Sequence, residues 1–147
     1  MAHASDSTPQ RLAERALLDL LQAQLGATFI EGAKLPVPLG VKPDGIDPDR
    51  KIVVEVFARI GRNKAAQDRK VRSDLFKLAY IRQVLGAPWR AVFCVADPQA
   101  AASTLGRSWA ADAARAFGVE ICVVELPDDL RAQLLATQAK QRMVNAP

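Results

Sequence analysis

Histidine and cysteine are scarce in this chain, and their scarcity excludes several kinds of site. The 147 residues contain one histidine, His3, and two cysteines, Cys94 and Cys122. They cannot supply the closed ligand set of a structural zinc site, and serine-histidine or cysteine-histidine catalysis lacks a suitable histidine. Both cysteines stand in apolar runs, which is typical of free buried thiols in a cytoplasmic protein.

Long apolar runs and a secretory leader are also lacking. No run approaches the ~18 residues that suggest a membrane span, and residues 1–9 have no apolar core of a signal peptide. Half of the residues are hydrophobic and 24% are charged, which is the balance of a soluble globular protein. We therefore expect a cytoplasmic protein without a membrane partner, with residues 1–8 as a disordered segment and residues 9–147 as a single domain.

Positive charge is concentrated in one stretch of the chain. The formal net charge is +4, but residues 1–58 carry −2, residues 59–77 carry +5 and residues 78–147 carry +1. Such a cluster is typical of a protein that binds a polyanion, although a solvated helix face gives the same pattern. The basic residues of this stretch are Arg59, Arg62, Lys64, Arg69, Lys70, Arg72 and Lys77.

Helix and strand patterns alternate along the chain and predict an α/β fold. The clearest strands are apolar and β-branched, and we expect them to be central and buried. The predicted strands cover residues 51–60, 89–96 and 119–126, with short strands compatible with 28–34 and 39–42. The predicted helices cover residues 9–26, 63–85, 97–117 and 127–145. This order indicates a sheet covered on both faces, with parallel pairing in its second half.

One carboxylate is out of place in the clearest strand. Glu55 is flanked by Val54 and Val56, and burying a carboxylate costs several kcal/mol unless it is paired or binds a cation. Because side chains alternate along a strand, Glu55 shares a face with Phe57 and Arg59. A salt bridge from Glu55 to Arg59 or to a helix lysine is the simpler structural explanation.

A second carboxylate and a helix start point to the same region. Asp44 stands in Pro43-Asp44-Gly45, which we place at the end of a short strand before the strand of Glu55. In the following helix, Gln67 and Lys64 fall on the same face as the apolar stripe. A helix N-terminus that lines a site has this pattern, although an ordinary exposed first turn also gives it.

Two carboxylates held close together bind a hard divalent cation through oxygen ligands. We expect Asp44 and Glu55, with the carbonyl group of Val56, to bind Mg²⁺ or Mn²⁺. Such an ion polarises a phosphodiester and lowers the pKa of an attacking water. A nearby lysine stabilises the developing charge, and surrounding basic residues hold the nucleic-acid backbone.

This arrangement resembles the PD-(D/E)XK nuclease superfamily, which includes type II restriction enzymes and archaeal Holliday junction resolvases. The matching residues are Pro43-Asp44 and, eleven positions after Asp44, Glu55-Val56-Phe57. The resemblance covers residues 10–96. It implies a restriction endonuclease-like αβββαβ core, here extended by a further helix and strand, with a mixed central sheet and helices on both faces. It also implies a metal-dependent DNA nuclease.

The sequence departs from the superfamily pattern at Phe57, which occupies the lysine position. Some members carry the lysine on the next helix, and others have lost activity. The helix lysines that can replace it are Lys70 and Lys64, beside Gln67, which resembles the helix glutamine of the exonuclease branch; the resemblance favours Lys70. Many members complete the site with a glutamate of the first helix, which corresponds to Glu14, although a solvated helix charge is the alternative.

These residues support three hypotheses. The first is a Mg²⁺- or Mn²⁺-dependent endo- or exodeoxyribonuclease. The second is a catalytically inactive nuclease-like domain that binds nucleic acid or a protein partner. The third is an α/β small-molecule or regulatory domain, which leaves the buried Glu55 unexplained and has no glycine-rich phosphate loop. A homodimer is compatible with the first, because 147 residues offer little surface for reading bases. The expected DNA contacts are Arg59, Arg62, Lys64, Arg69, Arg72 and Lys77.

Overall fold

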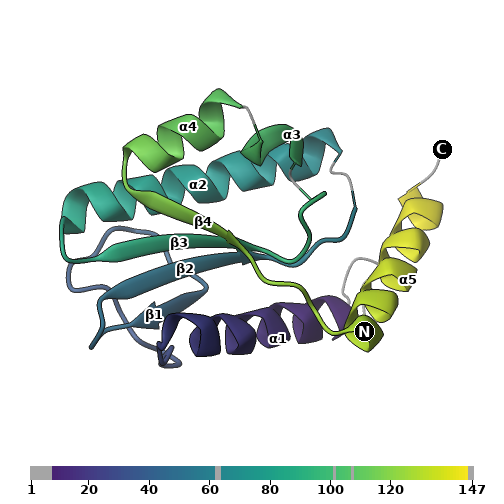
Figure 1. The fold of residues 1–147 in the computed structure, drawn as a ribbon, viewed down its shortest axis with the longest axis horizontal. Helices are drawn as coiled ribbons and strands as arrows, with labels where there is room; N and C mark the ends of the chain where they lie inside the picture. Colours follow the sequence, from purple (N-terminus) through teal and green to yellow (C-terminus); the bar gives the residue numbers. More distant parts are fainter. Residues whose placement is uncertain (1–7, 62–63, 101, 107, 146–147) are drawn as a thin grey trace.

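The computed structural model describes residues 8–61, 64–100, 102–106 and 108–145 (Figure 1). In chain order the elements are α1 (Thr8–Leu25), β1 (Gly45–Asp47), β2 (Ile52–Phe57), α2 (Ala65–Leu85), β3 (Arg90–Val95), α3 (Ala102–Leu105), α4 (Trp109–Ala116), β4 (Val119–Val123) and α5 (Asp128–Asn145). Most of the expected disordered segment, residues 1–7, lies outside the described residues, and α1 begins at Thr8. None of the helices within these ranges is long and apolar enough to cross a membrane.

The strands form a four-stranded mixed sheet in the order β1-β2-β3-β4. β1 is antiparallel to β2, whereas β2, β3 and β4 are parallel to one another. Parallel neighbours need a long crossover connection, which α2 provides between β2 and β3 and which α3 and α4 provide between β3 and β4. The predicted α/β class and the parallel second half of the sheet are confirmed.

Helices cover both faces of the sheet, as predicted (Figure 1). α1 packs on one face through Leu17 and Leu21, and α5 packs beside α1. α2 covers the opposite face through Leu75 and Leu78. Because strand side chains alternate between the faces, β2 contributes to both apolar layers, and all six of its residues are buried.

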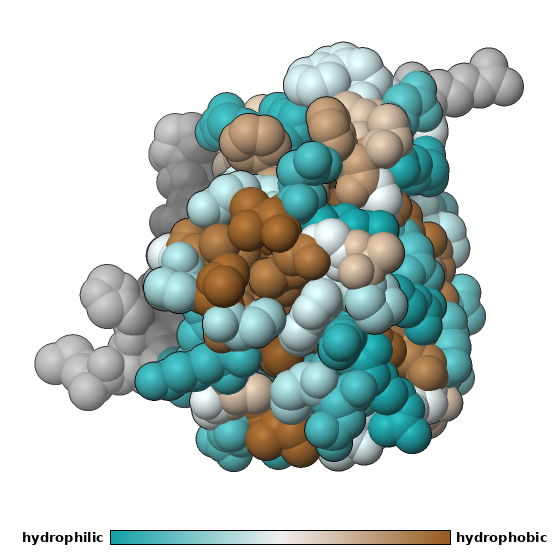
Figure 2. All heavy atoms as spheres, turned by 90° about the vertical axis from the view of Figure 1, so that its left-hand side faces the viewer, coloured by the Kyte–Doolittle hydropathy of each residue, from teal (hydrophilic) through white to brown (hydrophobic). Residues whose placement is uncertain are grey.

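The surface has hydrophobic areas as well as a buried core. Figure 2 faces the side of the molecule where α2 ends, and it shows hydrophobic side chains gathered into a patch with hydrophilic ones around it. Three of the exposed hydrophobic side chains belong to α2, namely Phe76, Tyr80 and Val84. α2 therefore has an outward apolar surface in addition to the one that faces the sheet.

The predicted strands at 51–60 and 89–96 are central, but the strand predicted at 119–126 lies at the edge. β4 has a single neighbouring strand and is only partly buried; its last residue, Val123, is 43% exposed. The Glu120 carboxylate of β4 accepts two hydrogen bonds at the surface from the Arg90 guanidinium, at 2.7 and 2.8 Å. The apolar composition of a strand does not reveal whether it has one neighbour or two.

The chain before β2 also differs from the prediction. Residues 28–34 and 39–42 form no strand, and β1 is confined to Gly45–Asp47. Pro36, Pro38 and Pro43 interrupt this segment, and proline has no backbone N–H to give to a sheet. Asp44 therefore precedes β1 and does not end a strand. In the described residues the order is αββαβ, with one strand fewer than the expected αβββαβ core.

The helix predicted over 97–117 is divided into α3 and α4. α3 ends at Leu105 and α4 begins at Trp109; before α4, the Ser108 hydroxyl oxygen accepts a hydrogen bond from the Ala111 backbone N–H at 3.2 Å. A serine in this position starts a new helix, because it satisfies an N–H group that has no partner within the helix. Asn63, the predicted cap of α2, lies outside the described residues.

Gly45 allows β1 to lie close to its neighbours. A Cβ atom at this position would lie 2.9 Å from Cγ2 of Val54 and 3.0 Å from Cγ of Phe29. We therefore expect Gly45→Ala to lower the free energy of unfolding by about 1–3 kcal/mol, the usual cost of overpacking. Urea denaturation measures this change, and an unchanged unfolding midpoint would contradict the close approach of β1.

Candidate functional site

Glu55 lies in the middle of β2, with its side chain on the face that α2 covers. The residue is 2% exposed, and Val53 and Phe57 of the same face belong to the apolar layer beneath α2. The Lys77 Nζ of α2 donates a hydrogen bond to Glu55 Oε1 at 2.5 Å. Of the two simple partners expected for this glutamate, the helix lysine is therefore the one found, and Arg59 is not.

The path of α2 explains why Lys77 meets Glu55. β2 and β3 are parallel, so the helix that connects them runs in the opposite direction to both. The chain leaves the sheet after Phe57, and α2 begins only at Ala65. The helix then travels about 18 Å back to Lys77, at about 1.5 Å per residue. A residue in the middle of β2 consequently faces the middle of α2 and not its first turns.

Asp44 approaches Glu55 from the segment before β1. Asp44 Oδ2 accepts a hydrogen bond from the Val56 backbone N–H at 2.9 Å. The Asp44 carboxyl group lies close enough to Glu55 to raise the pKa of that glutamate. The structure thus brings together the two carboxylates that the sequence singled out, with the backbone of Val56 beside them.

The Val56 carbonyl is left without a donor from the ladder. β1 and β2 pair with Gly45 opposite Val54, so extending the register by two residues places Pro43 opposite Val56. Proline has no N–H to donate, and the two backbone polar groups of a strand residue point to the same side. The Val56 carbonyl therefore points toward the Asp44 side of β2, where it can serve as an additional oxygen ligand.

The three charged groups shift one another's pKa values. Burial is the largest cause that raises the pKa of Glu55; the hydrogen bond and charge of Asp44 and the charge of Asp74 raise it further, Lys77 opposes them, and the result is about 8. Burial by itself would lower the pKa of Lys77, but the hydrogen bond and charge of Glu55 and the other carboxylates raise it. The site therefore combines a carboxyl pair that retains a proton with an ammonium group that stays charged.

Other buried carboxylates of the chain have a different role. Among the described residues, Asp47 accepts three hydrogen bonds from backbone N–H groups, and Asp97 accepts two. These aspartates stabilise the turns that follow β1 and β3. The Glu55 carboxyl group is bound by the side chains of Lys77 and Asp44 instead, so it does not hold a turn in place.

Asp74 extends the cluster along α2. It is buried, and its Oδ2 accepts a hydrogen bond from Lys70 Nζ at 3.2 Å. Lys70, the preferred replacement for the superfamily lysine, has a side chain that is 63% exposed. It is bound to Asp74 and lies about 10 Å from Lys77 along the helix axis. The lysine that reaches Glu55 is Lys77, whose Nζ also lies 3.5 Å from the Lys42 carbonyl oxygen.

Two predicted catalytic residues lie elsewhere. Gln67 precedes Lys77 by about 15 Å along α2, and its Oε1 accepts a hydrogen bond from the Lys64 backbone N–H at 2.8 Å, which caps the helix. Glu14 is exposed on α1, which covers the opposite face of the sheet, and its carboxylate accepts a hydrogen bond from Gln10 at 3.3 Å. The helix start therefore does not line the carboxyl pair.

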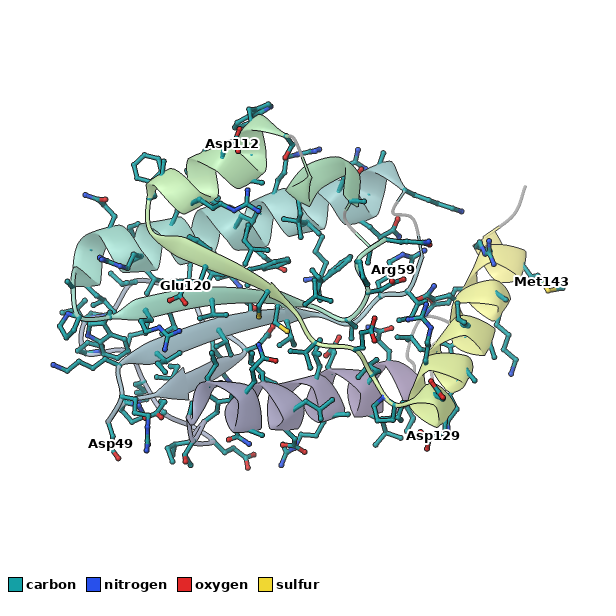
Figure 3. The ribbon with its side chains drawn as sticks, in the orientation of Figure 1. Asp49, Arg59, Asp112, Glu120, Asp129 and Met143 are labelled. Atoms are coloured by element: carbon teal, nitrogen blue, oxygen red, sulfur yellow. The ribbon has the colours of Figure 1, made fainter. Side chains whose placement is uncertain are left out.

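The basic stretch does not form one continuous surface. Arg59 is half-buried between the end of β2 and α5 (Figure 3), and within the described residues its Nε is buried without a hydrogen-bond partner. Arg72 borders α4, on another flank of α2 than Lys77. Lys64 and Arg69 are exposed, and Arg62 lies outside the described residues.

The roles of Lys77 and Asp74 were missing from the sequence-based site. The sequence placed Lys77 among the phosphate contacts, and Asp74 received no function. The available signal was their spacing with Lys70, because residues separated by three and four positions share one helix face. The spacing does not give the level at which that face crosses β2, which depends on the length of the connection after the strand.

Asp44 is accessible from solvent. It borders a hollow of about 260 Å³, whose other walls include Arg15, Asp19 and Gln22 of α1. A separate apolar cavity of about 630 Å³ lies between α2 and α4 and contains none of the carboxyl pair. The carboxyl pair and the apolar cavity therefore lie at different places in the molecule.

Comparisons of the chain with protein-family models, curated proteins and solved structures find no match.

Within the ranges that the structure describes, no group of three or more histidine, cysteine, aspartate or glutamate residues is placed to hold a metal ion. Two carboxylates and one carbonyl group are thus the protein ligands that this geometry offers. Mg²⁺ commonly binds with one or two carboxylates and completes its shell with water and phosphate oxygens.

Glu55→Gln tests the cost of burying this carboxylate. In the folded protein the pKa of Glu55 is raised from 4.5 to about 8. The contribution of this residue to the unfolding free energy is therefore fully present below pH 4.5, its unfolded pKa, and is lost as the pH rises through the folded pKa. Glutamine does not titrate. We expect the unfolding free energy of the variant to gain a few kcal/mol relative to the wild type as the pH rises across this window. Denaturant unfolding at several pH values measures it, with the exposed Glu31→Gln as control; a pH-independent difference would contradict the assignment.

Proposed function

We propose that this chain is a metal-dependent nuclease that hydrolyses phosphodiester bonds of DNA. The observation that carries the proposal is the carboxyl pair at β2, in which the buried Glu55 meets the exposed Asp44 beside the charged Lys77. The proposed relation is to the PD-(D/E)XK superfamily. It is supported by the position of Pro43-Asp44 before a strand that is antiparallel to the strand of Glu55.

The residues of the site fit a divalent cation. Removing a proton from the carboxyl pair leaves two negative charges close together, which a cation neutralises. Glu55 has a second oxygen besides the one bound to Lys77, and the Val56 carbonyl has no ladder donor from Pro43. We propose that Asp44, Glu55 and Val56 hold Mg²⁺ or Mn²⁺. When bound, such an ion polarises the phosphodiester and lowers the pKa of an attacking water.

Lys77 takes the role that the superfamily gives to a lysine on the strand. Phe57, at the usual position, is 5% exposed and stacks with Phe93 at a ring-centroid distance of 6.5 Å. A lysine there would lie in the apolar layer. Lys77 instead delivers an ammonium group to the carboxyl pair from α2. There it can stabilise negative charge that develops on a phosphate.

Metal binding tests the ligands. We expect Mn²⁺ to bind the wild type, and we expect Asp44→Asn and Glu55→Gln each to abolish measurable binding in calorimetric titrations. The matched control is Asp49→Asn, because Asp49 is an exposed aspartate of the turn after β1 (Figure 3). Binding should strengthen as the pH rises through about 8, because the ligands must lose a proton. Unchanged Mn²⁺ affinity in Glu55→Gln would show that the ligands are wrong.

The rate of DNA cleavage tests the proposed role of Lys77. Lys77→Met should lower the rate of Mn²⁺-dependent DNA cleavage on the order of 100-fold, the scale for removing one charge-stabilising donor, while Mn²⁺ still binds. Lys70→Met is the matched control, because its ammonium group binds Asp74 on the same helix and not Glu55. A large loss in Lys70→Met with normal activity in Lys77→Met would return the role to Lys70.

One observation favours a second candidate function. Lys77 contacts Glu55 and balances the remaining negative charge of the carboxyl pair without a metal ion, as a nuclease-like domain that has lost catalysis would do. Such a domain would bind nucleic acid or a protein partner. Highly purified wild type that binds DNA in a salt-dependent manner, but cleaves no linear, supercoiled, single-stranded or branched DNA with Mn²⁺, would identify this second function.

A further inference from the structure

An unusual share of the aromatic residues lines one groove between α2 and α4. The chain has eight aromatic residues, and four of them border the apolar cavity of about 630 Å³ between these helices. All four are exposed: Phe76 by 79%, Trp109 by 77%, Phe117 by 56% and Tyr80 by 44%. Folded monomers rarely leave so many large apolar side chains together in water, and a patch of this kind marks an interaction surface.

The groove is poor in charge, which argues against a polyanion as its occupant. Arg72 is the single charged residue among those that line it in the described part of the chain. Nucleic-acid affinity depends on several cations that neutralise phosphates. An apolar protein surface fits this groove better than a nucleic acid does.

The groove carries both kinds of surface that a two-fold contact needs. Small side chains, Ala79, Ala110, Ala113 and Ala114, line it together with the aromatic ones. Protruding rings and the depressions that can receive them are thus present on the same surface. A two-fold axis through such a surface places the rings of each copy over the alanines of the other, so every contact is made twice.

The exposed ring area is more than half of what each partner buries in a stable dimer. An aromatic side chain offers about 150–250 Å² for burial, so the exposed fractions of these four give on the order of 500 Å². A standard interface buries about 800 Å² on each partner, and the rim of the groove on α2 and α4 has to supply the remainder, because Ala110 and Ala114 are themselves buried. We propose that the α2–α4 groove is a homodimer interface, formed by two copies of this chain around a two-fold axis.

This interface leaves the carboxyl pair open. Lys77 and Asp74 lie on the flank of α2 that faces β1 and the Asp44 segment, whereas Phe76 and Tyr80 lie on the flank that faces α4. The dimer therefore does not depend on the proposed nuclease activity. It also gives an assembly with two separate carboxyl sites.

Substitutions at the exposed rings test the interface. We expect the wild type to have twice the mass of one 15.9 kDa chain in size-exclusion chromatography with light scattering. Phe76→Glu and Trp109→Glu each place two like charges in a two-fold interface, and each should raise the dimer dissociation constant by at least about 100-fold. Because both side chains are largely exposed within one chain, circular dichroism and unfolding of the monomer should stay unchanged.

Met143→Glu is the matched control, because Met143 is 80% exposed on α5, away from the groove. It should leave the dimer intact. A wild-type mass of one chain up to millimolar protein overturns the proposal, as does equal weakening by Met143→Glu. If the wild type and the Phe76→Glu variant are both monomers and only the variant loses DNA binding, the proposal is also overturned, and the groove is assigned to nucleic acid.

Discussion

The burial of one carboxylate in the centre of the sheet determines how the surrounding elements are arranged. Glu55 is closed in by α2 on a strand whose residues are all buried, so water cannot solvate it and the protein has to supply its partners. Lys77 comes from α2, and Asp44 comes from the segment before β1. Asp44 is itself held by the backbone of Val56. The positions of β1, β2 and α2 are therefore coupled through three side chains.

Much of this arrangement can be predicted from local pattern. The valines around Glu55 indicate that it is buried. The position of Pro43-Asp44 before the strand indicates that the Asp44 carboxylate lies near Glu55. The central strands, the parallel pairing and the cover of helices on both faces also follow from composition and periodicity. The identity of the lysine does not, because Lys70, Asp74 and Lys77 share one helix flank and their level relative to β2 depends on where α2 begins.

Other errors have the same origin in tertiary structure. The pattern of 119–126 is as apolar as that of a central strand, yet β4 has one neighbour and ends at Val123. Glu14 falls at a suitable place in the chain, but α1 lies on the face of the sheet opposite to Glu55. Residue type and spacing give the faces of an element, whereas its neighbours are decided by the assembly of the whole sheet.

The proposed function depends most directly on whether Asp44 and Glu55 bind a cation together, and anomalous scattering from crystals soaked in Mn²⁺ tests this. We expect one Mn²⁺ peak within bonding distance of a carboxylate oxygen of Asp44, one of Glu55 and the Val56 carbonyl oxygen, with Lys77 beside it. Crystals that diffract well, have an accessible Asp44 and show no Mn²⁺ there, with Lys77 still bound to Glu55, would contradict the proposed function. The cluster would then be an ion pair that only stabilises the fold.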